Sequence, residues 1–242
     1  MVARLGDYNV EAIILAGGYG TRLKSVVSDV PKPMASIQSK PFLAYLLDHL
    51  KQSGFTEIIL TVGYQHQVIM DYFGHQYQSM KLKYSIEKEL LGTGGAIKKA
   101  CEYSDSDLLF VINGDTFVEV DYFSLLQQHL SHASSLSMTL KKLPDVSRYG
   151  SVIVENGSVV SFTEKGLSGP GLINAGVYLL HKKIFDISQL PHTFSFEHHF
   201  LFPFVEKIKP GAFVTEGYFI DIGIPADYER AQVELPKLGD NT

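Results

Sequence analysis

Residues 10–34 read VEAIILAGGYGTRLKSVVSDVPKPM, and this stretch decides the fold. It opens with a short apolar run ending in Leu15 and Ala16, which is typical of a strand that is buried on both faces. Gly17, Gly18 and Gly20 follow at once and allow a tight turn with close backbone approach to a ligand. Each glycine alone is equally explained by a tight strand-to-helix turn, so the prediction rests on the run as a whole.

The residues after the glycines suit an anionic ligand. Successive free N–H groups in such a loop form an anion-binding concavity. Thr21 and Arg22 follow directly, and Lys32 lies between Pro31 and Pro33, which stiffen its backbone. We therefore expect the loop to hold a polyphosphate, with Arg22 and Lys32 supplying positive charge.

Two other phosphate-binding loops are excluded by spacing. A P-loop has a lysine directly after its last glycine and then Ser or Thr, whereas Thr21 and Arg22 stand there. A dinucleotide fingerprint has a third glycine where Leu23 stands and an acidic residue about 20 positions further on. The predicted second strand ends in LTVG at residues 60–63, without an acidic residue.

Composition limits the class of protein. The 242 residues fit one large α/β domain spanning 1–242, and 45% hydrophobic residues are enough for a core. A net charge of −5 gives no general attraction to nucleic acid or to an anionic membrane, so neither is expected as a partner. The single Cys101 excludes an intramolecular disulfide, and the nine histidines show no zinc-site spacing. No apolar run approaches the ~20 residues of a membrane span, and the N-terminus lacks a signal layout, which predicts a soluble, cytoplasmic protein.

The hydrophobic pattern predicts alternating strands and helices, and therefore βαβ units around a mostly parallel sheet. The expected fold class is α/β, a Rossmann-like three-layer sandwich with a mixed sheet. A nucleotide-binding half at about 1–120 would precede a more antiparallel half at about 121–242. Strands are predicted at 10–16, 57–62, 82–86, 108–112, 136–140, 152–154, 159–162 and 172–180, and helices at 42–53, 65–73, 94–101, 121–130, 196–207 and 225–234.

The run LAGGYGTRL followed by PKPM resembles the signature of the sugar-1-phosphate nucleotidylyltransferases, and the resemblance covers almost the whole chain. A second glycine loop, EKELLGTGGA at residues 87–96, resembles the family's loop that lies against the base and ribose of the nucleotide. Glu87 stands at the position where relatives have a Gln or Glu that reads the base. The nucleotide-binding residues that the resemblance implies are Leu15, Ala16, Gly17, Gly18, Gly20, Thr21, Glu87, Gly92 and Thr93.

Two aspartates follow apolar runs near strand ends. Asp115 ends the run LLFVINGD, and Asp221 lies in YFIDIG. Either one alone would suit a turn, but together they resemble the paired aspartates that hold Mg²⁺ against the nucleotide phosphates in this family. Hard carboxylate oxygens combined with substrate phosphates are what Mg²⁺ prefers.

The resemblance implies a reaction and a substrate side. A sugar-1-phosphate oxygen would attack the α-phosphorus of a nucleoside triphosphate and release pyrophosphate, which depends on positioning and charge more than on a protein nucleophile. Arg22, Lys32 and Asp115 are the implied catalytic residues. The implied substrate-binding residues are Gly114, Tyr149, Gly150, Glu164, Lys165 and Asn174.

Within this family, the stretches quoted above and FIDIGIPADYERA are most similar to the D-glycero-D-manno-heptose-1-phosphate guanylyltransferases. Transfer to mannose-, glucose- or N-acetylmuramate 1-phosphate from GTP, dTTP or UTP remains an alternative. A non-catalytic nucleotide-sugar-binding regulatory subunit is a second one, disfavoured because Arg22, Lys32, Asp115 and Asp221 are all present. The composition also leaves a homodimer open.

Overall fold

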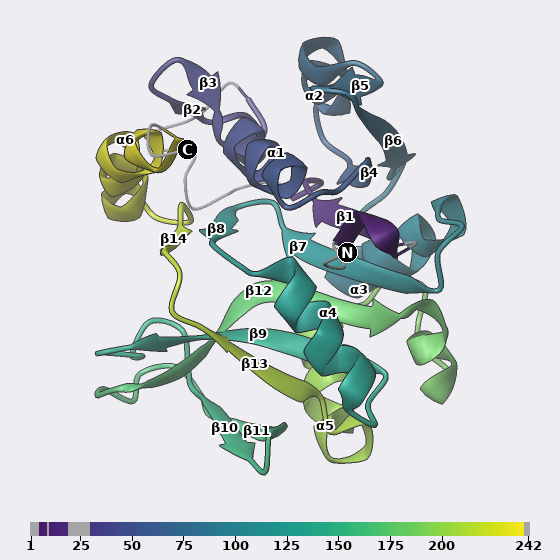
Figure 1. Cartoon of the computed structure of the whole chain (residues 1–242), viewed down its shortest axis with the longest axis vertical. Coiled ribbons are helices and arrows are strands. Elements are labelled where there is room, and N and C mark those ends of the chain that lie inside the picture. The colour runs from purple at the N-terminus through teal and green to yellow at the C-terminus, as the bar shows by residue number, and fades with distance from the viewer. Residues whose placement is uncertain (1–4, 9, 19–29, 240–242) are drawn as a thin grey trace.

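One ten-stranded sheet runs through the molecule (Figure 1). The computed structural model describes residues 5–8, 10–18 and 30–239. Within them the strand order is β10-β11-β13-β9-β12-β7-β1-β4-β6-β5. The strands are β1 (Glu11–Leu15), β4 (Glu57–Val62), β5 (Gln76–Tyr77), β6 (Met80–Ile86), β7 (Leu108–Asn113), β9 (Leu136–Leu143), β10 (Val152–Glu155), β11 (Ser158–Phe162), β12 (Gly171–His181) and β13 (Gly211–Thr215).

The sheet is mixed and mostly parallel. Strands β7, β1, β4 and β6 pair in parallel and form the block of the first half. In the second half, β12 pairs antiparallel with both β7 and β9, and β13 returns parallel to β9. Consequently β10, β13, β9, β7, β1, β4 and β6 run in one direction, and β11, β12 and β5 run in the other.

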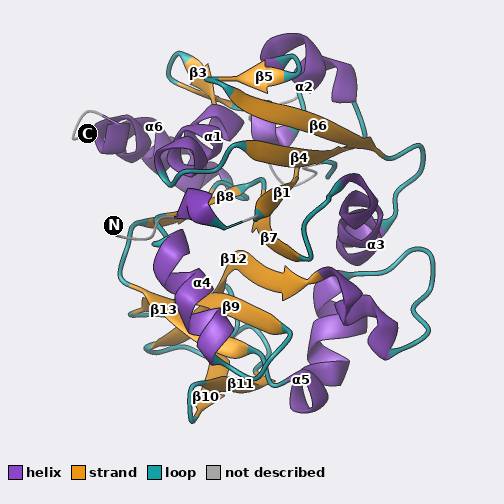
Figure 2. Ribbon diagram, turned by 45° about the vertical axis from the view of Figure 1, so that its right-hand side comes forward, coloured by secondary structure: helices purple, strands orange, loops and turns teal. Residues whose placement is uncertain are grey.

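Helices cover both faces of the sheet and make three layers (Figure 2). Alternation along β1 explains this, because Ala12 and Ile14 point into one apolar cluster while Ile13 points into the other. The first cluster lies under α1, α2, α4 and α6, and the second under α3 and α5. The helices are α1 (Phe42–Gln52), α2 (His66–Phe73), α3 (Gly92–Ala100), α4 (Tyr122–Ser131), α5 (Phe202–Ile208) and α6 (Pro225–Gly239). The fold is thus the expected Rossmann-like α/β sandwich.

The chain reverses its direction of travel across the sheet beside β1. From β1 it passes outward through β4 to β6, with α1 and α2 on one face, and returns along α3 on the other face to β7. The carboxyl ends of β1 and β7 therefore diverge at a topological switch point, where open α/β sheets bind ligands. Gly17 follows β1 there, and Gly114 and Asp115 follow β7.

A short ribbon joins the end of the chain to this point. β14 (Phe219–Asp221) pairs antiparallel with β8 (Thr116–Val118), and Asp221 lies opposite Thr116. The Ile222 N–H also donates to the Asp115 carbonyl at 3.0 Å. This pairing brings together two aspartates that are far apart in the sequence. A second ribbon, β2 (Ser36–Ile37) with β3 (Lys40–Pro41), precedes α1.

Local turn chemistry agrees with several predicted boundaries. Gly54 ends α1 with φ +96°, and Gly74 ends α2 with φ +59°, so both occupy the left-handed region that favours glycine. The Asp121 carboxylate caps α4 by accepting from the Ser124 N–H at 2.9 Å. Asn156 and Gly157 both have positive φ, as the two-residue turn between β10 and β11 requires.

The short strands β2, β3, β5, β8 and β14 were not predicted, and three further differences are larger. The expected helix 196–207 is a π-helix (Phe196–Leu201) followed directly by α5, and Pro203 lies at the second position of α5. The closing helix continues past Glu234 to Gly239. Strand β13 was not predicted, because GAFVT is short and its pairing with β9 is non-local. Among the described helices, none is long and apolar enough to cross a membrane.

Candidate active site

A cavity of about 350 Å³ opens at the switch point. It lies beyond the carboxyl ends of β1 and β7 and is closed on one side by the start of α3. Most of the described residues that were predicted to bind nucleotide or act in the reaction line it: Leu15, Gly17, Gly18, Lys32, Glu87, Gly92, Thr93 and Asp115. Gly114, predicted to bind substrate, lines it as well. Gly20, Thr21 and Arg22 lie outside the described residues.

Backbone contacts fix the floor of this cavity. The Gly114 N–H donates to the Leu15 carbonyl at 3.1 Å, and the Ala16 N–H donates to the Thr61 carbonyl at 2.9 Å. A Cβ at position 114 would lie 2.5 Å from the Leu15 oxygen, so a larger residue there would push the two strand ends apart. Ala16 is fully buried and does not line the cavity, so its contribution is to this packing.

The Lys32 ammonium lies between the two aspartates. Its Nζ is 2.6 Å from Asp115 Oδ2 and 3.8 Å from Asp221 Oδ1. The lysine side chain is only 9% exposed, and it extends from the 3-10 helix Lys32–Met34, which the flanking prolines help to shape. A buried cation of this kind is stable only when it is paired, and here two carboxylates share it.

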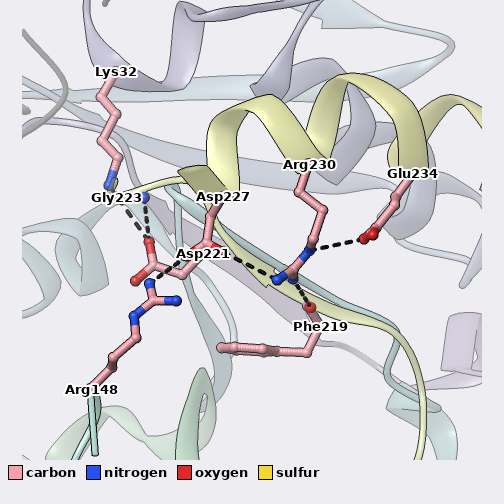
Figure 3. A network of polar contacts seen from close by, with 8 residues as sticks. All are labelled: Lys32, Arg148, Phe219, Asp221, Gly223, Asp227, Arg230 and Glu234. Atoms are coloured by element: carbon pink, nitrogen blue, oxygen red, sulfur yellow. Dashed lines mark hydrogen bonds and ion pairs between the residues drawn. The ribbon is translucent and has the colours of Figure 1, made fainter. Parts of the chain in front are cut away.

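The turn after β14 fixes the second aspartate (Figure 3). The Gly223 N–H donates to Asp221 Oδ1 at 2.7 Å. A Cβ at position 223 would lie 2.8 Å from that oxygen and 3.2 Å from Lys32 Nζ. Glycine is therefore needed here for the carboxylate and the ammonium to meet, a requirement that the sequence did not reveal.

The donor set of this site fits a magnesium ion. Asp115 and Asp221 offer carboxylate oxygens to the same point, which the Lys32 ammonium marks as a place of favourable positive charge. Mg²⁺ is commonly held by one or two carboxylates together with substrate phosphates and water. Within the described residues, no cluster of three or more His, Cys, Asp or Glu side chains gathers as a metal cage.

Glu87 also lines the cavity. Its Oε2 accepts from the Leu91 N–H at 3.1 Å, and its Oε1 lies so close to Gly17 that a Cβ there would be 2.7 Å away. Burial raises the pKa of the Glu87 carboxyl, an effect that the Leu91 N–H and the Lys99 charge partly oppose. The carboxylate is therefore held in a half-buried position between the two glycine loops.

The second glycine loop has two different tasks. Gly92, with φ +69°, lines the cavity with Thr93, whose Oγ1 accepts from the Phe196 N–H at 2.8 Å. Gly94 instead accommodates the Phe194 ring, which would lie 2.1 Å from a Cβ at that position. Part of the loop's glycine content therefore serves packing, beyond the predicted nucleotide-binding residues Glu87, Gly92 and Thr93.

Of the predicted sugar-side residues, Gly114 lines the cavity, and Tyr149, Gly150, Glu164, Lys165 and Asn174 do not. Gly150 has φ +75°, and a Cβ at this position would lie 2.6 Å from the Thr163 carbonyl oxygen. The Tyr149-Gly150 turn therefore packs closely against the loop that carries Glu164 and Lys165. The Tyr149 ring makes an edge contact with Phe219, two residues before Asp221, at 5.8 Å between centroids. Glu164 and Lys165 are themselves exposed.

Asn174 is already engaged by other side chains. Its Nδ2 donates to the Tyr178 hydroxyl at 2.6 Å and to Glu197 Oε1 at 3.0 Å, and its Oδ1 accepts from the Gly176 N–H. Both amide hydrogens therefore have partners. Glu197, in the π-helix, was not singled out from the sequence, because no local pattern links it to β12.

Other cavity residues were also missed. Asn113 ends β7 and contacts Gly176, while Thr61 lies near the end of β4. Both could have been found from one rule, since polar residues at the carboxyl ends of buried parallel strands face the ligand site.

Comparison with known proteins agrees with this geometry. Residues 11–237 match the nucleotidyl transferase family. The chain belongs to that family. The match runs from β1 to α6.

This nucleotidyl transferase is similar to two heptose-specific enzymes. It is 47% identical over 226 residues to the D-glycero-alpha-D-manno-heptose 1-phosphate guanylyltransferase of Aneurinibacillus thermoaerophilus, covering 93% of this chain and 98% of that protein. It is 47% identical over 220 residues to the corresponding enzyme of Campylobacter jejuni, covering 90% and 97%. The structure of HddC from Yersinia pseudotuberculosis complexed with GMP-PN is 45% identical, with a TM-score of 0.81 over 92% of this chain and 97% of that chain.

Proposed function

We propose that this nucleotidyl transferase transfers GMP from GTP to D-glycero-D-manno-heptose 1-phosphate. The products would be pyrophosphate and a GDP-activated heptose, of the kind that polysaccharide synthesis consumes. The observation that carries the proposal is 47% identity over nearly full length to heptose 1-phosphate guanylyltransferases. The site supports it, because the Lys32, Asp115 and Asp221 side chains meet at the edge of the cavity.

The reaction needs one bond to form and one to break. A phosphate oxygen of the sugar 1-phosphate attacks the α-phosphorus of GTP, and the bond from that phosphorus to the oxygen of the pyrophosphate group breaks. No proton has to be removed from an ionised phosphate nucleophile. The protein's contribution is then orientation of the two phosphates and compensation of their negative charge.

We assign the charge compensation to three groups. Asp115 and Asp221 would hold Mg²⁺, which when bound supplies positive charge to the nucleotide phosphates. Lys32 would turn its ammonium from the aspartates toward a triphosphate oxygen, over a short path because its Nζ already lies at the cavity edge. Arg22, which follows the glycine loop, would neutralise the departing pyrophosphate.

Recognition is divided between the two walls. Glu87 would accept hydrogen bonds from the guanine N1–H and exocyclic amine, since a carboxylate offers two acceptor oxygens. Leu15, Gly17, Gly18, Gly92 and Thr93 line the space available to the base, ribose and phosphates. On the sugar side, Lys165 would bind the phosphate of the sugar 1-phosphate. The sugar site would be formed by Gly114, Tyr149, Gly150, Glu164 and Asn174.

A substrate panel tests the function directly. Purified protein is incubated with Mg²⁺, one of GTP, UTP or dTTP, and one of the heptose, mannose, glucose or N-acetylmuramate 1-phosphates. Pyrophosphate release is measured and the nucleotide sugar is identified by mass. We expect the highest kcat/KM for GTP with the heptose 1-phosphate. A higher value for another pair would contradict the assigned substrates, and nucleotide binding without any pyrophosphate release would indicate a regulatory subunit.

A further inference from the structure

Asp227 is a buried carboxylate that holds two arginines from different parts of the chain (Figure 3). It lies in the first turn of α6 and is 4% exposed. Arg148 Nη2 contacts its Oδ2, and Arg230 Nη1 lies 3.2 Å from its Oδ1. Each carboxylate oxygen is thus paired with a different guanidinium group, in a geometry that favours strong charge-assisted hydrogen bonds.

The two arginines connect Asp227 to different structures. Arg230 is one turn further along α6, and it also reaches Glu234 on that helix and the Phe219 carbonyl of β14. Arg148 belongs to the turn before β10, and its guanidinium carbon lies 5.2 Å from the centre of the Tyr149 ring. Of the two arginine contacts of Asp227, the one with Arg148 therefore links α6 to that turn.

The turn and the Glu164-Lys165 loop behave as one unit. The Gly166 N–H donates to the Ser147 carbonyl at 2.9 Å, and the Val146 N–H donates to the Gly169 carbonyl at 3.0 Å. The Gly169 N–H in turn donates to Asp145 Oδ1 at 3.1 Å. Whatever fixes Arg148 therefore fixes the segments at 145–150 and 163–169 together.

The Arg148–Asp227 pair satisfies one oxygen of a buried carboxylate, although the Arg148 side chain itself is 47% exposed. Its location gives it another consequence. α6 begins just after Asp221 and Gly223, so the pair connects the segments that carry Tyr149, Glu164 and Lys165 to the helix that follows the carboxylate facing Lys32.

We propose that Asp227 is a positioning residue for the sugar 1-phosphate. Through its ion pair with Arg148, Asp227 holds the 145–150 turn at a fixed position relative to Asp221. The 163–169 loop is held with that turn. This inference rests on the proposed assignment of these segments to the sugar side. It concerns a residue that need not touch either substrate.

The test compares two variants that each remove one partner of Asp227. Arg148→Ala cuts the link to the turn, whereas Arg230→Ala leaves it and is the matched control. We expect Arg148→Ala to raise the KM for the sugar 1-phosphate by about tenfold or more, because misplaced binding groups cost affinity on that scale. The KM for GTP should stay within about twofold of the wild-type value. Arg230→Ala should leave both near wild type. Equal effects of the two variants on the sugar KM, or none for Arg148→Ala, would overturn the proposal.

A second background separates positioning from direct contact. In an Asp227→Asn protein, Arg148→Ala should cause little further increase in the sugar KM, because the link is already weakened. If Arg148→Ala retains its full effect there, Arg148 acts directly on the substrate and the positioning role is wrong. Arg148→Lys keeps the positive charge, so it should bind the sugar 1-phosphate more tightly than Arg148→Ala does.

Hydrogen exchange gives a readout that does not depend on the substrate. Arg148→Ala and Asp227→Asn should speed amide exchange across 145–150 and 163–169, and Arg230→Ala should not. Unchanged exchange in all three variants would overturn the link even if the enzyme is active. If exchange is faster but the protein uses no sugar 1-phosphate, the ion pair still holds these segments. Only their assignment to the sugar side would then be refuted.

Discussion

The two walls of the active site are built in different ways. The nucleotide wall consists of backbone and buried side chains at the ends of β1 and β7, where Gly114 leaves no room for a Cβ against Leu15. The sugar wall consists of loops in which Glu164 and Lys165 are exposed, and it is joined to α6 by the Arg148–Asp227 ion pair. The first wall is fixed by the sheet, and the second by hydrogen bonds between loops together with that ion pair.

This difference suggests how one fold can serve several sugars. The phosphate chemistry requires charges placed to within a fraction of an ångström, which parallel strand ends provide. A sugar differs from its relatives mainly in its hydroxyl groups, and exposed loops can change without disturbing the sheet. Substitutions on the nucleotide wall should therefore affect turnover and base choice, and those on the sugar wall should affect sugar affinity. The predictions below test that division.

The largest effect is expected for the paired aspartates. Asp115→Asn or Asp221→Asn keeps the side-chain shape but removes charge that offsets the metal and the phosphates, and losing one such contact commonly costs ~10²–10³ in kcat. The measurement is steady-state pyrophosphate release with saturating Mg²⁺. Asp186→Asn, at an exposed aspartate of the Lys182–Ile187 segment, is the control for loss of one charge. Near-normal turnover of both site variants would refute the metal assignment.

Lys32→Met should have two opposite effects. Loss of the ammonium should lower kcat/KM for GTP by about 10–100-fold, the range of one charge-assisted hydrogen bond. In the nucleotide-free protein, however, the same change removes a cation that lies 2.6 Å from Asp115 Oδ2. The aspartates should then bind Mn²⁺ more tightly than in wild type, by about tenfold on the same scale, as measured by electron paramagnetic resonance. Unchanged Mn²⁺ affinity would mean that lysine and metal do not compete.

Glu87→Gln should reduce the preference for GTP over UTP. An amide offers one acceptor oxygen and an NH₂ group, so one guanine donor would lose its partner, which costs ~1–3 kcal/mol or about 5- to 150-fold in selectivity. Gly17→Ala should act in the same direction, because its Cβ would lie 2.7 Å from Glu87 Oε1 and displace that carboxylate. The ratio of kcat/KM values for GTP and UTP measures both.

The pH dependence of this selectivity provides a control. Burial raises the pKa of Glu87, so acidification protonates it at a higher pH than an ordinary glutamate. The preference for GTP should fall as the pH decreases through that raised pKa in wild type. It should not do so in Glu87→Gln. A wild type that prefers UTP, or a variant whose GTP preference is unchanged, would show that Glu87 does not read guanine.

The nucleotide wall could be predicted largely from sequence, because its parts are local. The apolar runs before Gly17 and Gly114 specify buried strands, and parallel strands end at one edge of the sheet. The meeting of Asp115 and Asp221 was expected only from the family resemblance, since the ribbon β8–β14 that unites them is too short to leave a pattern.

The sugar wall was harder to predict because its contacts are non-local. Arg148 and Asp227 are 79 residues apart, and neither lies in a pattern that signals an ion pair. β13 depends on pairing with β9, and Glu197 reaches Asn174 from a π-helix. Side-chain contacts between distant segments depend on how the second half packs, which hydrophobic periodicity does not encode.

The smallest effect is expected at Lys165, on the exposed part of the sugar wall. Lys165→Ala should raise the KM for the sugar 1-phosphate by about two- to fivefold, since an exposed charge in water contributes up to about 1 kcal/mol. Salt should diminish this difference, because a Debye length of ~8 Å at physiological ionic strength screens exposed charges. Lys142→Ala, at an exposed lysine of β9, is the control for net charge. If Lys165→Ala instead lowered kcat by the factor expected for Asp115→Asn, the sugar wall would be part of the phosphate chemistry, and the division between the two walls would be wrong.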